Sequence, residues 1–220
     1  MAKVRPSAVA PEPAAVTTSI TSGAVASPAE DEQPTVLTVW RKSLLFNCDG
    51  FTVFDVRGDL AFRVDCYGSG RRAEVVLMDK AGKPLLTVRR KRLTLAEHWI
   101  IYDGDAASSD GKSKPLLSVR RHVSLRASKA LAHVTPLASA AEAYVVEGSY
   151  GRRACAVRDA RGEAVAEVQR KESVGDDVFR LVADPRLGAA LAMGLVIALD
   201  EMFAGGGGSA RSLLRRTWSA

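Results

Sequence analysis

The residues of this chain that are best suited to bind a ligand lie in two runs of basic side chains. They end two similar segments, Pro84-Leu-Leu-Thr-Val-Arg-Arg90 and Pro115-Leu-Leu-Ser-Val-Arg-Arg121. Clustered lysine and arginine side chains hold phosphate oxygens through charge-assisted hydrogen bonds, which arginine often makes in pairs. We therefore predict an anion-binding or lipid-binding site. Its candidate residues are Arg89, Arg90, Lys91, Arg92, Arg120 and Arg121.

A second interpretation of these runs stays open. Neighbouring residues of a β-strand point to opposite faces, so only half of each run can contribute to one patch. The remaining charges would deter pairing between strand edges and keep the protein soluble. The formal net charge of +6 fits either interpretation, because it favours anionic partners as well as solubility.

The aromatic content argues against nucleic acid as the partner. Aromatic residues make up 6% of the chain, and none of them interleaves the basic runs as a stacking motif would. No recognition-helix pattern is present either. The anions favoured by this sequence are therefore phosphates and lipid headgroups.

The sequence predicts no enzymatic activity. Its three histidines, His98, His122 and His133, are scattered without the spacing of metal ligands. The sequence contains no Gly-x-Ser-x-Gly motif, and the glycine run 205–208 lacks the lysine of a phosphate-binding loop. We expect no catalytic residue, no metal site and no cofactor.

The cysteines indicate a reducing compartment. There are three, at positions 48, 66 and 155, an odd number without Cys-x-x-Cys spacing. We expect free structural thiols and an intracellular protein, either cytoplasmic or peripheral at the plasma membrane. The first residues are basic, but no apolar stretch of a secretion signal follows them.

The elements that would position the basic runs are short β-strands. Residues 1–34 have a proline-rich composition and no apolar period, which predicts a disordered tail. From Thr35 onward, strand patterns alternate with turn signals, among them an Asp-x-x-Gly motif at 55–58, 79–82 and 159–162. Aspartate in the first turn position and glycine in the fourth are typical of hairpin turns. We count about eleven or twelve strands between residues 35 and 183, as in a sandwich or barrel.

One predicted helix follows these strands. Asp184-Pro185 suits a helix start, and the glycines from Gly205 stop the helix after residue 203. The stretch 187–199 is apolar on every side, but it is shorter than the about 20 residues of a membrane span, and Asp200 follows it directly. Such a helix must be buried inside protein, and a barrel of about twelve strands is wide enough to hold it. We therefore predict a mainly β fold, a closed antiparallel barrel around a central hydrophobic C-terminal helix. A glycine-rich linker and basic tail, 204–220, follow the helix.

Several motifs of this chain resemble a known family. They are Val39-Trp-Arg-Lys-Ser-Leu-Leu-Phe-Asn47, Gly50-Phe-Thr-Val-Phe-Asp55, Phe62-Arg-Val-Asp65, Val76-Leu-Met-Asp79 and Thr87-Val-Arg-Arg-Lys91. In order and spacing, over about residues 35–203, they are similar to the plant LURP-one-related proteins. The resemblance implies the Tubby C-terminal-like fold, a closed twelve-stranded barrel around a hydrophobic C-terminal helix. It also implies a link to plant defence and no established enzymatic activity.

Two functions follow as expectations. Tubby proteins and phospholipid scramblases share the implied fold, and Tubby proteins bind phosphoinositides, but fold analogy alone is a weak argument for function. The first expectation is a non-enzymatic, monomeric protein that binds an anionic membrane lipid or a protein partner on its outer barrel surface. The alternative is a signalling or structural adaptor that binds no lipid and acts through its loops.

Overall fold

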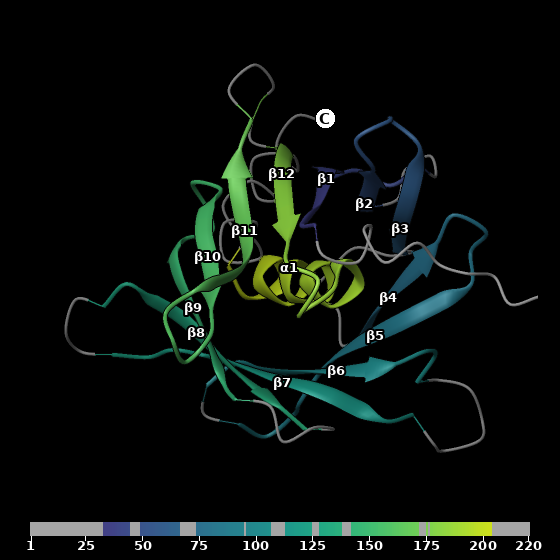
Figure 1. Cartoon of the computed structure of the whole chain (residues 1–220). Helices are drawn as coiled ribbons and strands as arrows, with labels where there is room; N and C mark the ends of the chain where they lie inside the picture. Colours follow the sequence, from purple (N-terminus) through teal and green to yellow (C-terminus); the bar gives the residue numbers. More distant parts are fainter. Residues whose placement is uncertain are drawn as a thin grey trace, which may run out of the picture.

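The fold is a single closed β-barrel that surrounds one helix (Figure 1). A computed structural model of the protein describes residues 33–44, 49–66, 74–94, 96–106, 113–124, 128–137, 142–171, 175 and 177–203. The predicted tails, 1–34 and 204–220, lie almost entirely outside these ranges.

Twelve strands form the barrel. Their bounds are β1 Thr35–Trp40, β2 Asp49–Phe54, β3 Leu60–Cys66, β4 Glu74–Asp79, β5 Pro84–Arg90, β6 His98–Asp103, β7 Pro115–Arg121, β8 Ala130–Pro136, β9 Tyr144–Ser149, β10 Ala154–Arg158, β11 Ala164–Arg170 and β12 Val178–Ala183. Each strand is antiparallel to the next along the chain, and β1 pairs with β12 to close the barrel. The predicted mainly β class and the barrel of about twelve strands are confirmed.

The three Asp-x-x-Gly motifs form the same turn. In each, one carboxylate oxygen of the aspartate accepts hydrogen bonds from the second and fourth backbone N–H groups after it, at 2.8–3.0 Å. The glycines Gly58, Gly82 and Gly162 have φ angles of 86°, 88° and 81°, in the left-handed region that glycine reaches without strain. The motif thus reverses the chain between β2 and β3, β4 and β5, and β10 and β11.

The helix α1, Ala189–Phe203, lies inside the barrel. Its residues from Ala192 to Asp200 are all buried, which confirms that this segment is a helix enclosed by the strands. Gly194 faces β5 and β6, where a Cβ atom would lie 3.3 Å from the side chains of Leu86 and Ile101. A small residue at this position lets the helix pack closely against the barrel wall.

The helix begins four residues later than the sequence suggests. Asp184 does not cap it; its backbone oxygen accepts hydrogen bonds from Leu187 and Gly188 and closes a turn. Gly188 then has a φ of 79°, which a right-handed helix cannot contain, so regular helix starts at Ala189. Among the described residues, no helix is long and apolar enough to cross a membrane.

Candidate functional site

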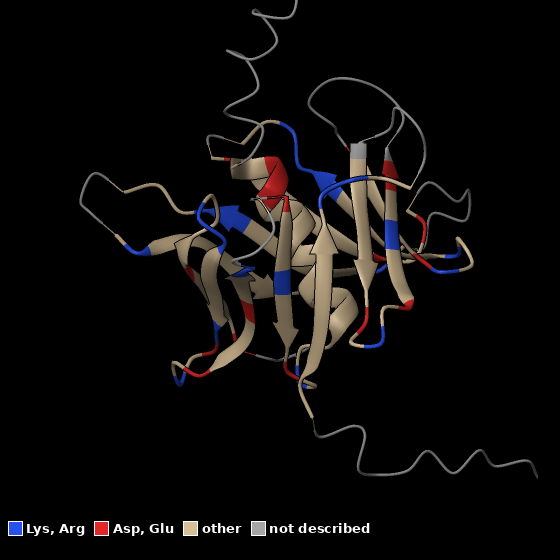
Figure 2. Ribbon diagram, turned by 90° about the horizontal axis from the view of Figure 1, so that it is seen from above, with Lys and Arg blue, Asp and Glu red and all other residues tan. Residues whose placement is uncertain are grey.

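The two ends of the barrel differ in charge (Figure 2). Strands β1, β5, β7 and β11 finish at one end, and basic residues stand at or directly after their last positions. We call this end the basic rim, formed by Arg41–Lys42, Arg89–Arg92, Arg120–Arg121, Arg152–Arg153 and Arg170–Lys171. The three Asp-x-x-Gly turns lie at the opposite end. The pair Arg71–Arg72 falls outside the described residues.

The acidic end of the helix meets the basic rim. Asp200 is buried, and the Nε atom of Arg41 lies 3.1 Å from both of its carboxylate oxygens. The hydroxyl of Tyr150 donates a hydrogen bond to Asp200 Oδ1 at 3.1 Å, and Arg153 Nη1 lies 4.0 Å from the same oxygen. A buried carboxylate requires such partners, and arginines also balance the negative end of the helix dipole. The sequence alone offered Asp200 only as a residue at the helix exit.

The two predicted basic runs lie close together. Strand β6 separates β5 from β7, with Arg90 opposite Trp99 and Arg120 opposite His98. The N–H of Lys91 donates to the backbone oxygen of His98 at 2.8 Å. Burial lowers the pKa of His98, and the positive charges of Arg120 and Lys91 lower this pKa further. These effects favour the neutral form of His98, which lies between two cations, one from each run.

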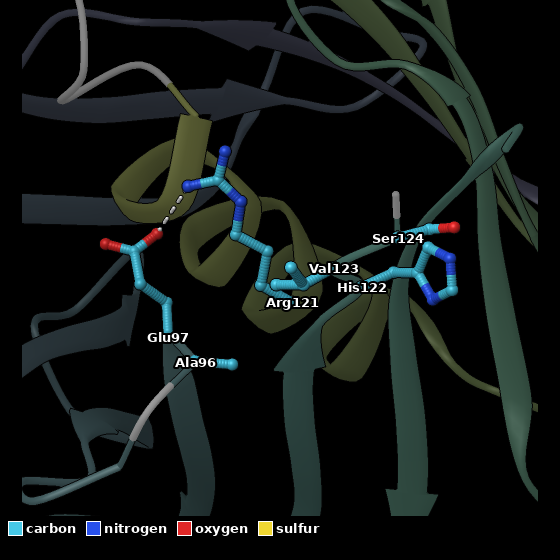
Figure 3. Close-up of a pocket in the computed structure, with 6 residues that line it drawn as sticks. All are labelled: Ala96, Glu97, Arg121, His122, Val123 and Ser124. Atoms are coloured by element: carbon cyan, nitrogen blue, oxygen red, sulfur yellow. Dashed lines mark hydrogen bonds and ion pairs between the residues drawn. The ribbon is translucent and has the colours of Figure 1, made fainter. Parts of the chain in front are cut away.

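Half of the predicted residues have acidic partners. Arg89 pairs with Glu74 at 2.6 Å. Arg121 pairs with Glu97 at 3.0 Å, as Figure 3 shows, and Arg90 lies 3.9 Å from the same carboxylate. The guanidinium of Arg121 also stacks over Phe203 at the end of the helix, 4.9 Å from the ring centre. These three arginines belong mainly to the architecture of the barrel.

The other half has no acidic partner among the described residues. Lys91, Arg92 and Arg120 are exposed, and no ion pair involves them within the described parts of the chain. Cations whose charge no neighbouring carboxylate compensates attract anions most strongly. These three side chains are the candidate anion-binding residues that the structure favours.

A shallow pocket opens beside them. It has a volume of about 410 Å³ and is lined by Ala96, Glu97, Arg121, His122, Val123 and Ser124 (Figure 3). Beside it, Nδ1 of His122 lies 3.0 Å from Nε2 of His133 on the neighbouring strand. Sequence reasoning missed this pair, because only the register of β7 against β8 brings the two histidines together. Within the described ranges, no group of three histidine, cysteine, aspartate or glutamate side chains could hold a metal ion.

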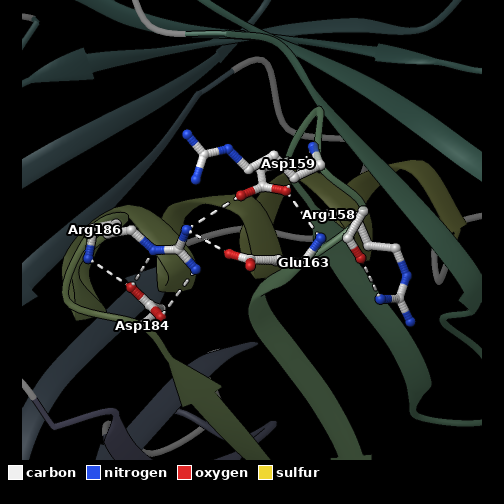
Figure 4. Close-up of polar contacts among 7 residues, drawn as sticks. Arg158, Asp159, Glu163, Asp184 and Arg186 are labelled. Carbon is white, nitrogen blue, oxygen red and sulfur yellow. Dashed lines mark hydrogen bonds and ion pairs between the residues drawn. The ribbon is translucent and has the colours of Figure 1, made fainter.

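At the opposite end of the barrel, one arginine is paired with three carboxylates. Arg186 contacts Asp184 at 3.0 Å, Asp159 at 3.2 Å and Glu163 at 3.0 Å (Figure 4). The hydrogen bonds from Arg186 hold the pKa of the Asp184 carboxyl below its usual value. This network ties the turn before the helix to the turn between β10 and β11. Its arginine is engaged by carboxylates, unlike Lys91, Arg92 and Arg120.

The comparison with known proteins gives one consistent result. A sequence model of the LURP-one-related family matches residues 35–200. LURP-one-related 8 of Arabidopsis thaliana is 45% identical over 177 residues, which cover 76% of this chain and 87% of the relative. LURP-one-related 12 of the same plant is 40% identical over 181 residues, 79% of each chain.

The fold has a solved counterpart. The X-ray structure of an Arabidopsis thaliana protein superposes with a TM-score of 0.56 at 25% sequence identity. The match covers 77% of this chain and 91% of that chain.

Proposed function

The chain belongs to the LURP-one-related family, and from this premise we propose that it is a non-enzymatic protein that binds anionic membrane lipid through its basic rim. Its ligand is a phosphoinositide-like headgroup presented on an intracellular membrane surface. A role in plant defence is the physiological setting that the family resemblance suggests.

One observation carries the proposal. Lys91, Arg92 and Arg120 are exposed on one rim, whereas glutamates compensate the neighbouring Arg89, Arg90 and Arg121. Exposed lysines also occur at the opposite end, but Lys80 and Lys83 lie in a turn that begins with Asp79, whereas Lys91, Arg92 and Arg120 add to a rim that carries further basic pairs. A surface potential of one sign, not cancelled locally, attracts the negatively charged surface of a cytoplasmic leaflet.

The buried helix favours a ligand site on the surface of the barrel and not in its interior. It fills the barrel interior with buried side chains from Ala192 to Asp200, where other barrels hold a ligand. A ligand of the folded protein is therefore expected on the outside, where Lys91, Arg92 and Arg120 are exposed.

A flotation assay tests the proposal. The full chain is mixed with phosphatidylcholine vesicles that contain, or lack, phosphatidylinositol bisphosphate, at low salt. We expect flotation only with the anionic lipid. The triple variant K91A/R92A/R120A should bind about a hundredfold more weakly, because each basic residue near an anionic surface contributes about 1 kcal/mol.

A matched control distinguishes the effect of where the basic residues lie from the effect of the net charge. The variant K80A/K83A/K114A removes three exposed lysines from the opposite end of the barrel and lowers the net charge equally. It should bind like the wild type. If the wild type fails to float at low salt, lipid binding is wrong, and the adaptor acting through its loops becomes the better explanation.

A further inference from the structure

Two loops of the basic rim expose apolar side chains next to their basic residues. Leu93 directly follows Lys91 and Arg92 and has a relative exposure of 105%. Val123 follows the run that contains Arg120 and is 73% exposed. Large apolar side chains that project from a charged surface are typical of contact with a membrane or a partner protein.

The backbone holds Leu93 outward at a cost. Its φ of 61° lies in the left-handed region, which is unfavourable for a residue with a bulky side chain. The hydroxyl of Thr94 donates to the backbone oxygen of Ala96 at 2.8 Å and thereby fixes the loop around Leu93. A strained residue that stabilises no core requires another explanation, and strain of this kind is typical of functional sites.

The two loops lie side by side. Residues of both, Ala96 and Glu97 from one and Val123 and Ser124 from the other, line the same shallow pocket (Figure 3). Val123 lines this pocket and Leu93 lies three residues before Ala96, and the exposed cations Lys91, Arg92 and Arg120 lie within three residues of them along the chain. Apolar tips that alternate with cations match a bilayer surface, where acyl chains lie beneath anionic phosphates.

We propose that these loops form a membrane-insertion edge, in which Leu93 and Val123 enter the acyl-chain boundary of an anionic bilayer while Lys91, Arg92 and Arg120 contact the phosphates. This inference rests on the proposed lipid binding and adds an apolar component to it. Its consequence is that the bilayer, and not the free headgroup, is the preferred ligand.

Flotation of the full chain at increasing salt tests the insertion edge. The variant L93N/V123S removes both apolar tips and keeps the loop conformation, because asparagine tolerates the left-handed region. On vesicles of phosphatidylcholine and phosphatidylinositol bisphosphate, the wild type should retain part of its binding at about 0.5 M salt, where charge attraction is screened. The variant should bind about tenfold more weakly at low salt and lose its binding at high salt.

The control variant V56S removes a valine that is 77% exposed in the turn between β2 and β3, at the opposite end of the barrel. It should bind like the wild type at every salt concentration. If L93N/V123S also matches the wild type while K91A/R92A/R120A loses binding, the insertion edge is wrong and the lipid proposal stands. Absence of wild-type binding contradicts both. Free inositol phosphate that binds as tightly as vesicles would also overturn insertion.

Discussion

At the scale of single residues, the function of a charge depends on its neighbours across strands. Arg90 and Lys91 are adjacent in sequence, yet Arg90 faces Glu97 and Lys91 faces solvent. The basic runs could be predicted from the sequence as candidate anion-binding residues. The sequence did not indicate which of their side chains pair with carboxylates. Glu74 and Glu97 come close to Arg89 and Arg121 only because of the register between neighbouring strands, and the sequence pattern does not specify that register.

Buried titratable groups predict a loss of stability at alkaline pH. Burial raises the pKa of the Cys155 thiol to about 12 and holds the pKa of the Tyr150 hydroxyl well above its ordinary value of 10.0. Above pH 9 the unfolded chain loses the cysteine proton while the folded protein keeps it. The free energy of unfolding should therefore fall by up to about 1.4 kcal/mol per pH unit for Cys155, with Tyr150 adding to this above pH 10.

Urea unfolding between pH 8 and pH 11 measures this effect. The variant C155A removes the thiol and should show a shallower decline, even though it is less stable at neutral pH because of the cavity it leaves. Equal declines for the wild type and C155A would contradict the assignment to this residue.

At the scale of elements, the Asp-x-x-Gly turns could be predicted from sequence because everything that specifies them is local. The aspartate, the two N–H groups it binds and the glycine lie within five consecutive residues. The helix start is different. Asp184-Pro185 is a favourable local signal, but its carboxylate binds Arg186, and Gly188 breaks the backbone before Ala189.

The glycine of such a turn gives a prediction for one element. Gly162 has a φ of 81°, and a Cβ atom there would meet nothing within 4 Å. The substitution G162A should therefore act through backbone strain alone and lower the free energy of unfolding by about 1–2 kcal/mol. G162N should cost less, because asparagine tolerates this conformation. G151A is the control; it alters a glycine in the β9–β10 turn that has open space and no positive φ, so its effect should be small.

Urea unfolding at neutral pH ranks the three variants. If G162A proves as stable as G151A, the left-handed backbone is not what the turn requires of its glycine.

At the scale of the whole molecule, the barrel and its helix depend on each other, and this is why the fold could be predicted. A helix that is apolar on every side and follows many strands has few ways to bury its side chains other than to lie inside the sheet that those strands form. The gathering of basic residues at one end of the barrel could not be predicted in this way. It arises because the basic runs follow β1, β5, β7 and β11, which all finish at the rim that Asp200, in the last turn of the helix, contacts through Arg41.

Removal of the helix should therefore abolish the fold. A fragment that ends at residue 184 keeps all twelve strands but loses α1, whose buried side chains include Met193, Leu195, Ile197 and Leu199. Burying a helix of this composition contributes on the order of 12–24 kcal/mol before entropy, which is comparable to or larger than the whole stability of an ordinary domain, about 5–15 kcal/mol. The emptied barrel would expose its apolar lining, so we expect the fragment to be insoluble on expression. Deletion of residues 1–33, which ends before β1 begins at Thr35, is the control and should give soluble protein. A soluble fragment 1–184 that melts cooperatively would mean that the strands hold the barrel closed without the helix.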